Sequence, residues 1–263
     1  MGAVNYRDGI AILQLILYPV LLITAVFIWR RVGWRAGGKC WRFVVTLSLL
    51  RIAGSICTLL SINNDSMNII IAEDVCALIG IAPLLLTYVG LIGQIDAETR
   101  KINPRHLKFL YLLGFLGLIL GIVGVSIMKD KGPFRANGEV KAAMGIFIAL
   151  FVVITLATGW LASQLGSAMS VWQKKLLLAI GLSWPFLLIR LIYSAMGDFS
   201  TDTRFTVLSP KASNTNVTIY LCMSVLEELV AMGFCVIFGM SSENQKERKL
   251  GSETNFGLET ANV

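Results

Sequence analysis

The sequence predicts an all-α membrane protein, a polytopic bundle of seven transmembrane helices. Of its 263 residues, 56% are hydrophobic and only 15% are charged, whereas soluble domains carry about 25% charged residues. The mean hydropathy is +0.72. The apolar residues gather in seven stretches, each close to the roughly 20 residues that a helix needs to cross a bilayer core. This surplus of apolar side chains is expected to face lipid.

The seven stretches are separated by short polar segments. In chain order they are approximately Gly9–Trp29, Phe43–Ile62, Met67–Gly93, Phe109–Met128, Ala142–Gln164, Leu176–Met196 and Val217–Met240. The first has no small-residue cleavage site behind it and is followed by Arg30 and Arg31, so we expect a retained span rather than a signal peptide. Residues 1–240 are therefore expected to form one transmembrane domain. Residues 241–263, rich in Ser, Asn, Glu, Gly and Lys, are expected to form a disordered cytoplasmic tail.

The basic residues indicate an orientation. Residues 30–42, 96–108, 165–175 and those after 240 hold 14 Lys and Arg residues, and the opposite set of loops with the N-terminus holds 7. Because basic loops stay in the cytoplasm, this predicts an N-terminus outside and a C-terminus inside. Weak glycosylation motifs at Asn64 and Asn216 would then lie on the outer side. The bias does not distinguish the plasma membrane from an endomembrane.

Several charged residues fall inside the predicted spans. Arg51 lies in the second, Arg190 in the sixth, and the pairs Glu73–Asp74 and Glu227–Glu228 in the third and seventh. Such a charge costs about 2.5–3.5 kcal/mol at the centre of a span, so it is expected to be paired, hydrated or used. The acids outnumber the arginines, and at least one carboxyl is therefore expected to be protonated.

One face of the sixth span is the best candidate for a polar lining. Arg190, Tyr193 and Ser194 are spaced to share that face, Asp198 follows them, and Pro185 can kink the helix. Adjacent residues on a helix point about 100° apart, so Glu227 and Glu228 cannot both face one partner. The candidate substrate-binding residues are Arg51, Arg190, Tyr193 and Asp198, and the candidate catalytic acids are Asp74, Glu227 and Glu228. Structural ion pairs that fix the helix register are an equally open interpretation.

The sequence gives no ligands for a metal or a cofactor. Its one histidine, His106, lies in a basic loop, and its five cysteines are scattered without a C-x-x-C pair, so no metal site is expected. No cofactor is expected, because no G-x-x-x-x-G-K-[ST] motif is present to hold a nucleotide. The net charge of +7 is explained by cytoplasmic loops, and no nucleic-acid partner is expected.

The first three and last three stretches correspond weakly. Leu49–Arg51 resembles Leu187–Arg190, and Ile71–Val75 resembles Val225–Leu229. This correspondence suggests a 3+1+3 repeat with parallel halves, as in some transporters.

The motifs resemble those of a fungal family of seven-helix membrane proteins that carry a domain of unknown function. The resemblance lies in the runs Asn5–Ala11, Leu49–Gly54, Pro83–Leu86, Trp184–Ser194 and Leu226–Glu228. It implies a fungal source and a seven-helix bundle over the membrane region. It implies no activity and gives the charged residues no role.

Three functions remain open from the sequence. The first is an intramembrane protein that binds, or binds and transforms, a hydrophobic small molecule such as a lipid or a terpenoid-like compound of fungal secondary metabolism. Its motivation is the set of acids and arginines in the spans. A transporter or lipid translocator is the second, and a seven-helix sensor that signals through its tail is the third. Membrane lipid and a hydrophobic ligand are the partners expected, and the sequence leaves open whether a protein partner exists.

Overall fold

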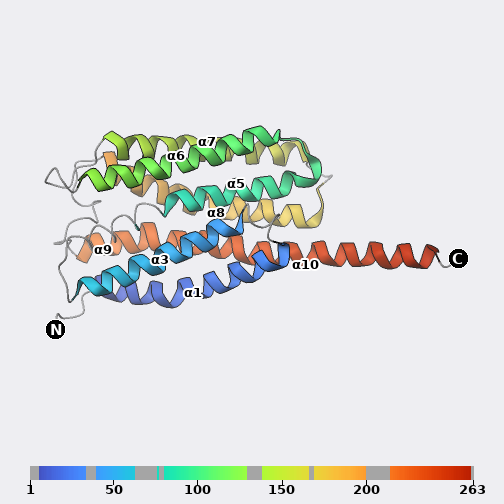
Figure 1. Cartoon of the computed structure of the whole chain (residues 1–263), viewed down its shortest axis with the longest axis horizontal. Helices are drawn as coiled ribbons and strands as arrows, with labels where there is room; N and C mark the ends of the chain where they lie inside the picture. Colours follow the sequence, from blue (N-terminus) through green and yellow to red (C-terminus); the bar gives the residue numbers. More distant parts are fainter. Residues whose placement is uncertain are drawn as a thin grey trace.

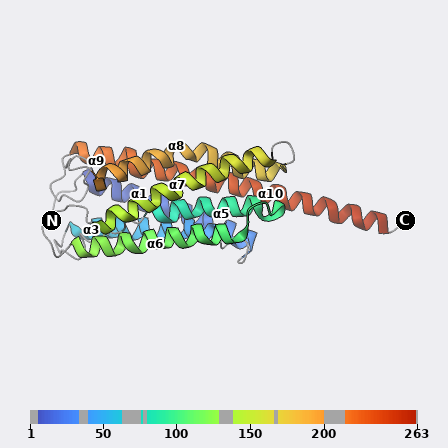
Figure 2. The same cartoon turned by 90° about the horizontal axis from the view of Figure 1, so that it is seen from above.

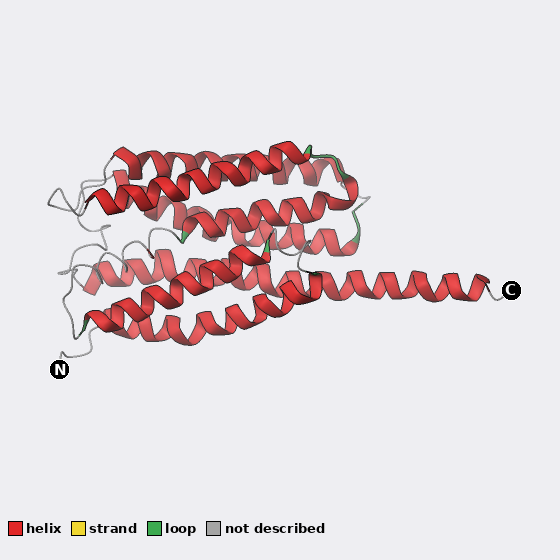
Figure 3. Ribbon diagram, in the orientation of Figure 1, coloured by secondary structure: helices red, strands yellow, loops and turns green. Residues whose placement is uncertain are grey.

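The computed structural model describes residues 6–33, 40–62, 76, 80–128, 138–165, 169–199 and 214–261. Within these ranges every regular element is a helix, as Figure 3 shows, so the predicted all-α class is confirmed. The elements are α1 (Tyr6–Val32), α3 (Trp41–Ser61), α5 (Ile81–Thr99), α6 (Pro104–Met128), α7 (Gly138–Leu165), α8 (Val171–Phe199), α9 (Asn214–Tyr220), η2 (Leu221–Leu226) and α10 (Glu227–Ala261).

The helices lie side by side along one axis, and successive passes run in opposite directions (Figures 1 and 2). The elements α9, η2 and α10 follow one another without a gap and make the last pass. Each pass contacts the next one in the chain, and α10 also contacts α1. The described helices therefore form a closed ring in chain order.

Helix α5 is the core of this bundle. It contacts α3, α6, α7 and α8, and all of residues 80–92 are buried. A helix that is apolar all round is stable only where other helices cover it, and the neighbours of α5 provide that cover. The described second half of the third predicted stretch, residues 80–93, thus lies at the centre of the bundle rather than facing lipid.

Six described helices are long and apolar enough to cross a membrane: α1, α3, α6, α7, α8 and the last pass. Their outer faces carry exposed aliphatic side chains such as Ile23 and Leu156, which are 69% and 68% exposed. Side chains of this kind are stable on a surface that contacts lipid, and the chain is a multi-pass membrane protein. The apolar part of α5, Ile81–Ala97, is shorter than the others.

The end of α5 differs from the prediction. The helix continues six residues past Gly93, because the Asp96 carboxylate caps its C-terminal turn. That carboxylate accepts backbone N–H bonds from Lys101 at 2.8 Å and from Ile102 at 3.1 Å. Most of the first half of the predicted stretch, which began at Met67, lies outside the described residues.

The C-terminal segment also differs from the expected disordered tail. Helix α10 continues past Met240 to Ala261 and leaves the bundle as a single rod (Figure 1). Glu, Gln, Lys and Arg are frequent between Glu243 and Lys249, and these residues favour a helix once the preceding turns have formed. Composition alone shows that this segment is hydrophilic, but it does not show that the segment continues the preceding helix.

Candidate functional site

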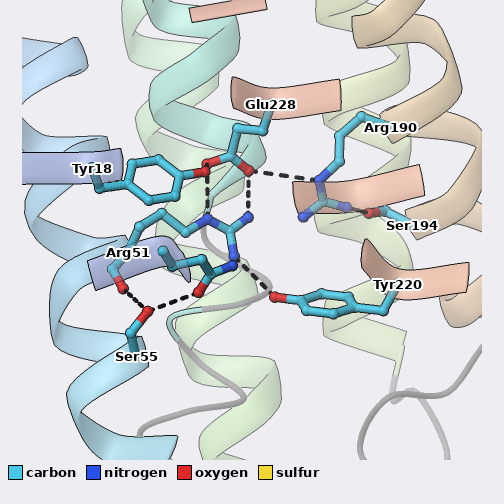
Figure 4. Close-up of polar contacts among 8 residues, drawn as sticks. Tyr18, Arg51, Ser55, Arg190, Ser194, Tyr220 and Glu228 are labelled. Atoms are coloured by element: carbon cyan, nitrogen blue, oxygen red, sulfur yellow. Dashed lines mark hydrogen bonds and ion pairs between the residues drawn. The ribbon is translucent and has the colours of Figure 1, made fainter. Parts of the chain in front are cut away.

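A buried ion pair joins α3 to α10 at the middle of the bundle. The Arg51 guanidinium donates from Nε to Glu228 Oε1 at 2.8 Å and from Nη2 to Glu228 Oε2, so the pair is bidentate (Figure 4). Arg51 is 3% exposed and Glu228 is fully buried. Paired charges that bond at both oxygens are the form in which a carboxylate is tolerated at membrane depth.

Two tyrosines extend this pair to the first and last passes. The Tyr18 hydroxyl of α1 donates to Glu228 Oε1 at 3.3 Å, and Arg51 Nη1 donates to the Tyr220 hydroxyl at 3.2 Å. Tyr220 and Glu228 both face Arg51 because η2, a π-helical turn, lies between them. A π turn holds one residue more than an α turn, so their eight-residue spacing behaves as about seven residues, or nearly two full turns.

Arg190 of α8 contacts the same carboxylate from the opposite side. Its Nε lies 3.8 Å from Glu228 Oε2, and its Nη1 donates to the Ser194 hydroxyl one turn further along α8 (Figure 4). Arg190, Tyr193 and Ser194 are all buried, so the face that the sequence predicted does point into the bundle. Four passes, α1, α3, α8 and the last, therefore meet at Glu228.

Small and polar residues complete the surroundings of the pair. A Cβ placed on Gly80, at the start of α5, would lie 2.8 Å from Arg51 Nη2, so only glycine leaves room for the guanidinium there. On the other side, the Ser55 hydroxyl bonds to the Gln14 side chain at 2.7 Å and to the Arg51 backbone carbonyl at 2.8 Å. We call the set formed by Tyr18, Arg51, Arg190, Ser194, Tyr220 and Glu228 the polar network.

Of the acidic doublet in the last pass, only Glu228 belongs to the polar network. Glu227 points elsewhere and is partly exposed, as the 100° step between neighbours predicts, and its Oε2 has no hydrogen-bond partner among the described residues. Asp74 and its neighbour Glu73 lie outside the described residues. The described part of the polar network thus combines one carboxylate with two guanidinium groups.

Of the remaining predicted site residues, some are described by the structure and others are not. Asp198 is described, on the same face of α8 as Ser194, and it contributes to the crevice considered next. Asn64 lies outside the described residues, and Asn216 belongs to α9 but its side chain is outside them. Glycosylation at these two positions stays a prediction.

A narrow crevice of about 30 Å³ adjoins the polar network between α5, α6, α7 and α8. It has two polar lining residues, Ser194 and Asp198, and the others are apolar or glycine. The latter are Ile81, Gly117, Leu118, Gly121, Val125, Val140, Ala143, Met144 and Phe147. Because Ser194 also accepts a bond from Arg190, the crevice and the polar network share a residue.

Sequence reasoning missed Tyr18, Tyr220 and Gln14. Each is an ordinary amphipathic or amide side chain within a span, and only the charged residues stood out by their cost. The signal that could have found Tyr18 is its hydroxyl inside a predicted span, because a buried tyrosine hydroxyl usually finds a hydrogen-bond partner. Tyr220 could not have been placed without knowledge of the π turn.

The arrangement can hold helices together and can present polar groups to a ligand. Within the described ranges, no group of three or more His, Cys, Asp or Glu side chains could hold a metal ion. The polar atoms that border the crevice are a hydroxyl and a carboxylate, which suit hydrogen bonds to a ligand with an apolar body.

One comparison with known proteins gives a match. The family model described as Domain of unknown function (DUF7702) matches residues 4–245, which include the whole ring of helices. No curated protein and no solved structure matches the chain.

Proposed function

The chain belongs to the family of the Domain of unknown function (DUF7702), and we propose that it binds a small hydrophobic molecule in the crevice beside the polar network. The proposal includes seven membrane passes with the N-terminus outside and the C-terminus in the cytoplasm. The ligand class is a lipid or a terpenoid-like compound with one polar group.

The seven passes are supported by the geometry of α5. Its 19 residues span about 28 Å at 1.5 Å per residue, close to the roughly 30 Å of a bilayer core. It runs antiparallel to its chain neighbours (Figure 1). It contacts α3, α6, α7 and α8, and residues 80–92 are buried, so it does not need the long lipid-facing surface that the other six display. The basic residues support the orientation.

The observation that carries the ligand proposal is the composition of the crevice. Its walls are aliphatic and aromatic, and its polar groups are Ser194 and Asp198. A lining of this kind suits an apolar body that a few polar contacts orient, and at about 30 Å³ the crevice has to widen to admit it. An uncharged hydroxyl or amide donor on the ligand could bond to Asp198, and the Ser194 oxygen already accepts a bond from Arg190.

The role that this proposal gives to Glu228 is positioning. Both of its oxygens accept bonds from Arg51, and Oε1 also accepts from Tyr18. A carboxylate engaged in this way holds Arg51 and Arg190 in place, and Arg190 in turn holds Ser194. The proposal therefore requires no reaction at Glu228.

Mass spectrometry of the small molecules that copurify with the full chain tests the proposal. Organic extracts of the wild type are expected to contain an enriched hydrophobic species that is lost from Asp198→Asn and from Gly121→Leu. The leucine would fill the crevice, since the nearest atom to a Cβ on Gly121 is Ala143 Cβ at 3.9 Å.

Matched variants control for general damage to the protein. Glu139→Gln removes a carboxylate from the start of α7, and Gly145→Leu adds a side chain where nothing lies within 4 Å. Both should retain the enriched species. Equal enrichment in all variants, with every protein monodisperse in detergent, would contradict binding in the crevice.

One observation favours a sensor as a second candidate. Helix α10 contains Glu228 near its start and continues to Ala261, so a shift at the polar network could reach the C-terminal segment through a single helix. If the protein is a sensor, truncation after Met240 should abolish the response of the cell to the ligand, while the ligand still copurifies with the truncated protein. An unchanged response in the truncated protein would exclude it.

A further inference from the structure

A second cavity lies away from the polar network, on the side of the bundle where α7 and α8 meet over α5. Its volume is about 280 Å³. It is lined by Tyr88, Phe151, Ile154, Thr155, Thr158, Ile180, Gly181, Trp184 and Leu187. Gly181 and Trp184 are exposed on the outer surface, so this groove opens towards the lipid. We call it the lateral groove.

Trp184 is fixed at the rim of the lateral groove. Its indole Nε1 donates to the Thr155 hydroxyl at 3.0 Å, and its ring stacks on Phe151 with 5.9 Å between the ring centroids. These contacts connect α8 to α7 across the opening. The side chain is therefore held as a wall and does not lie loosely in the lipid.

The lateral groove also contains hydrogen-bond acceptors without a local donor. Pro185 has no N–H, so it cannot donate to the carbonyl of Gly181 four residues earlier, as an α-helix would require. The hydroxyl of Thr158 donates to the carbonyl of Ile154, which leaves its oxygen as an acceptor, whereas the Thr155 oxygen already accepts from Trp184. In a membrane such groups need a partner, because no bulk water reaches them.

Tyr88 forms the inner wall. Its hydroxyl oxygen is buried beside Ser183 and Cys235 and makes no hydrogen bond of normal geometry within the part of the chain that the structure describes. This hydroxyl can donate or accept a bond. No lining residue of the lateral groove carries a charge.

From these observations we propose that the lateral groove binds a neutral lipid alcohol, a sterol or an isoprenoid alcohol, taken from the bilayer. The sideways opening admits a molecule that is already dissolved in lipid. The absence of charge from the lining disfavours a fatty acid or a phospholipid headgroup, whose ions would be left unpaired. A hydroxyl group can donate to the Thr158 oxygen or to the Gly181 carbonyl and can accept from Tyr88.

This site is separate from the crevice of the proposed function. The crevice lies between α6, α7 and the Ser194–Asp198 end of α8. In the lateral groove, Gly181 is ten residues from the start of α8, about 15 Å along the helix. The two sites share no lining residue, so each can be blocked without touching the other.

Photolabelling of the full chain in nanodiscs tests the proposal. The probe is a cholesterol analogue that carries a diazirine and an alkyne. We expect the label on peptides of α7 and α8 that line the lateral groove, with competition by unlabelled cholesterol and none by cholestane, which lacks the hydroxyl. If farnesol competes and cholesterol does not, the alcohol is of the isoprenoid type.

Two variants locate the site. Gly181→Leu places a side chain where nothing lies within 4 Å of the Cβ, so it should fill the lateral groove, keep the fold and lower the labelling at least about fivefold. Thr158→Val removes one hydrogen-bond acceptor at nearly constant side-chain volume and should lower the labelling by less than Gly181→Leu does. Gly145→Leu, which also adds a leucine in open space on α7, should label like the wild type.

The outcomes also separate this proposal from the proposed function. Asp198→Asn should leave the photolabelling unchanged, even if it removes the copurifying molecule from the crevice. Labelling that is equal in Gly181→Leu and the wild type would overturn the proposal. The proposal would also be overturned if cholestane competed as strongly as cholesterol. It would be overturned as well if neither cholesterol nor farnesol competed.

Discussion

At the scale of single residues, Glu228 is the side chain on which the interior of the protein depends. It is fully buried and accepts bonds from residues of α1 and α3, with Arg190 of α8 close by. Removing one partner of a buried ion pair leaves the other charge uncompensated, and this is far more costly than the pair itself is favourable. Because Glu227 is adjacent to Glu228 but outside the polar network, a substitution of Glu227 is a matched control for the same substitution of Glu228.

The first prediction compares these two neighbours. Glu228→Gln should lower the free energy of unfolding in mild detergent by about 3–5 kcal/mol, since Arg51 loses its counter-ion. Glu227→Gln should change it by less than about 1 kcal/mol, because that side chain is partly exposed and outside the polar network. Denaturant titration followed by tryptophan fluorescence measures both. Similar losses in the two variants would show that the polar network does not depend on Glu228.

The sequence predicted some of these residues because charge is costly in lipid. Arg51, Arg190 and Glu228 were found by that argument, and all three meet in the structure. It could not identify which carboxylate each arginine contacts, because the π turn changes the rotation of the last pass ahead of Glu227. It also missed Tyr18, whose hydroxyl carries no charge to draw attention.

At the scale of helices, glycines determine how closely α6 approaches α7. Gly114, Gly117, Gly121 and Gly124 lie along α6 at spacings of three or four residues, which places them on one face. A Cβ on Gly117 would lie 2.7 Å from the Phe147 ring. Small residues let membrane helices pack at short distance, where dispersion contacts replace the hydrophobic effect as the source of stability.

The second prediction contrasts two glycines of this helix pair. Gly124→Ala should destabilise the protein by about 1–3 kcal/mol, because its Cβ would lie 2.6 Å from Val140 Cγ2 and 2.9 Å from the Val140 backbone nitrogen. Gly145→Ala on α7 meets nothing within 4 Å and should stabilise the helix by about 0.5–1 kcal/mol. Thermal unfolding in one detergent gives both values. A stabilised Gly124→Ala variant would mean that α6 and α7 are further apart than described.

The sequence was reliable for the existence of helices and less so for their ends. Six of the seven apolar stretches correspond to helices long enough to span a membrane, because apolar length is itself the physical requirement. The ends depend on local contacts that hydropathy does not measure, such as the Asp96 cap of α5. The continuation of α10 to Ala261 depends in the same way on the helix that precedes it.

At the scale of the whole molecule, the closed ring of helices separates apolar side chains from polar ones. The outer faces are apolar, and the polar network is enclosed where four passes meet. The 3+1+3 repeat and the orientation of the chain stay predictions. The number of passes has a direct consequence for the termini, because an odd number places them on opposite sides of the membrane.

The third prediction concerns that placement. In sealed microsomes, an added protease should digest an epitope tag at the C-terminus and leave a tag at the N-terminus intact, as seven passes and the basic loops require. Permeabilised microsomes, in which both tags should be digested, provide the control. Digestion of both tags in sealed vesicles would indicate an even number of passes and place α5 outside the set of spans.

The central claim is that the Arg51–Glu228 pair joins α3 to the last pass and so maintains the polar network. A double-mutant cycle of Arg51→Met and Glu228→Met, measured as the free energy of unfolding in one detergent, tests it most directly. Glu228→Met should lose about 3–5 kcal/mol and Arg51→Met less, because Arg190 stays beside Glu228, while the double variant should lose less than the sum of the two single losses. Losses that simply add in the double variant would contradict the claim.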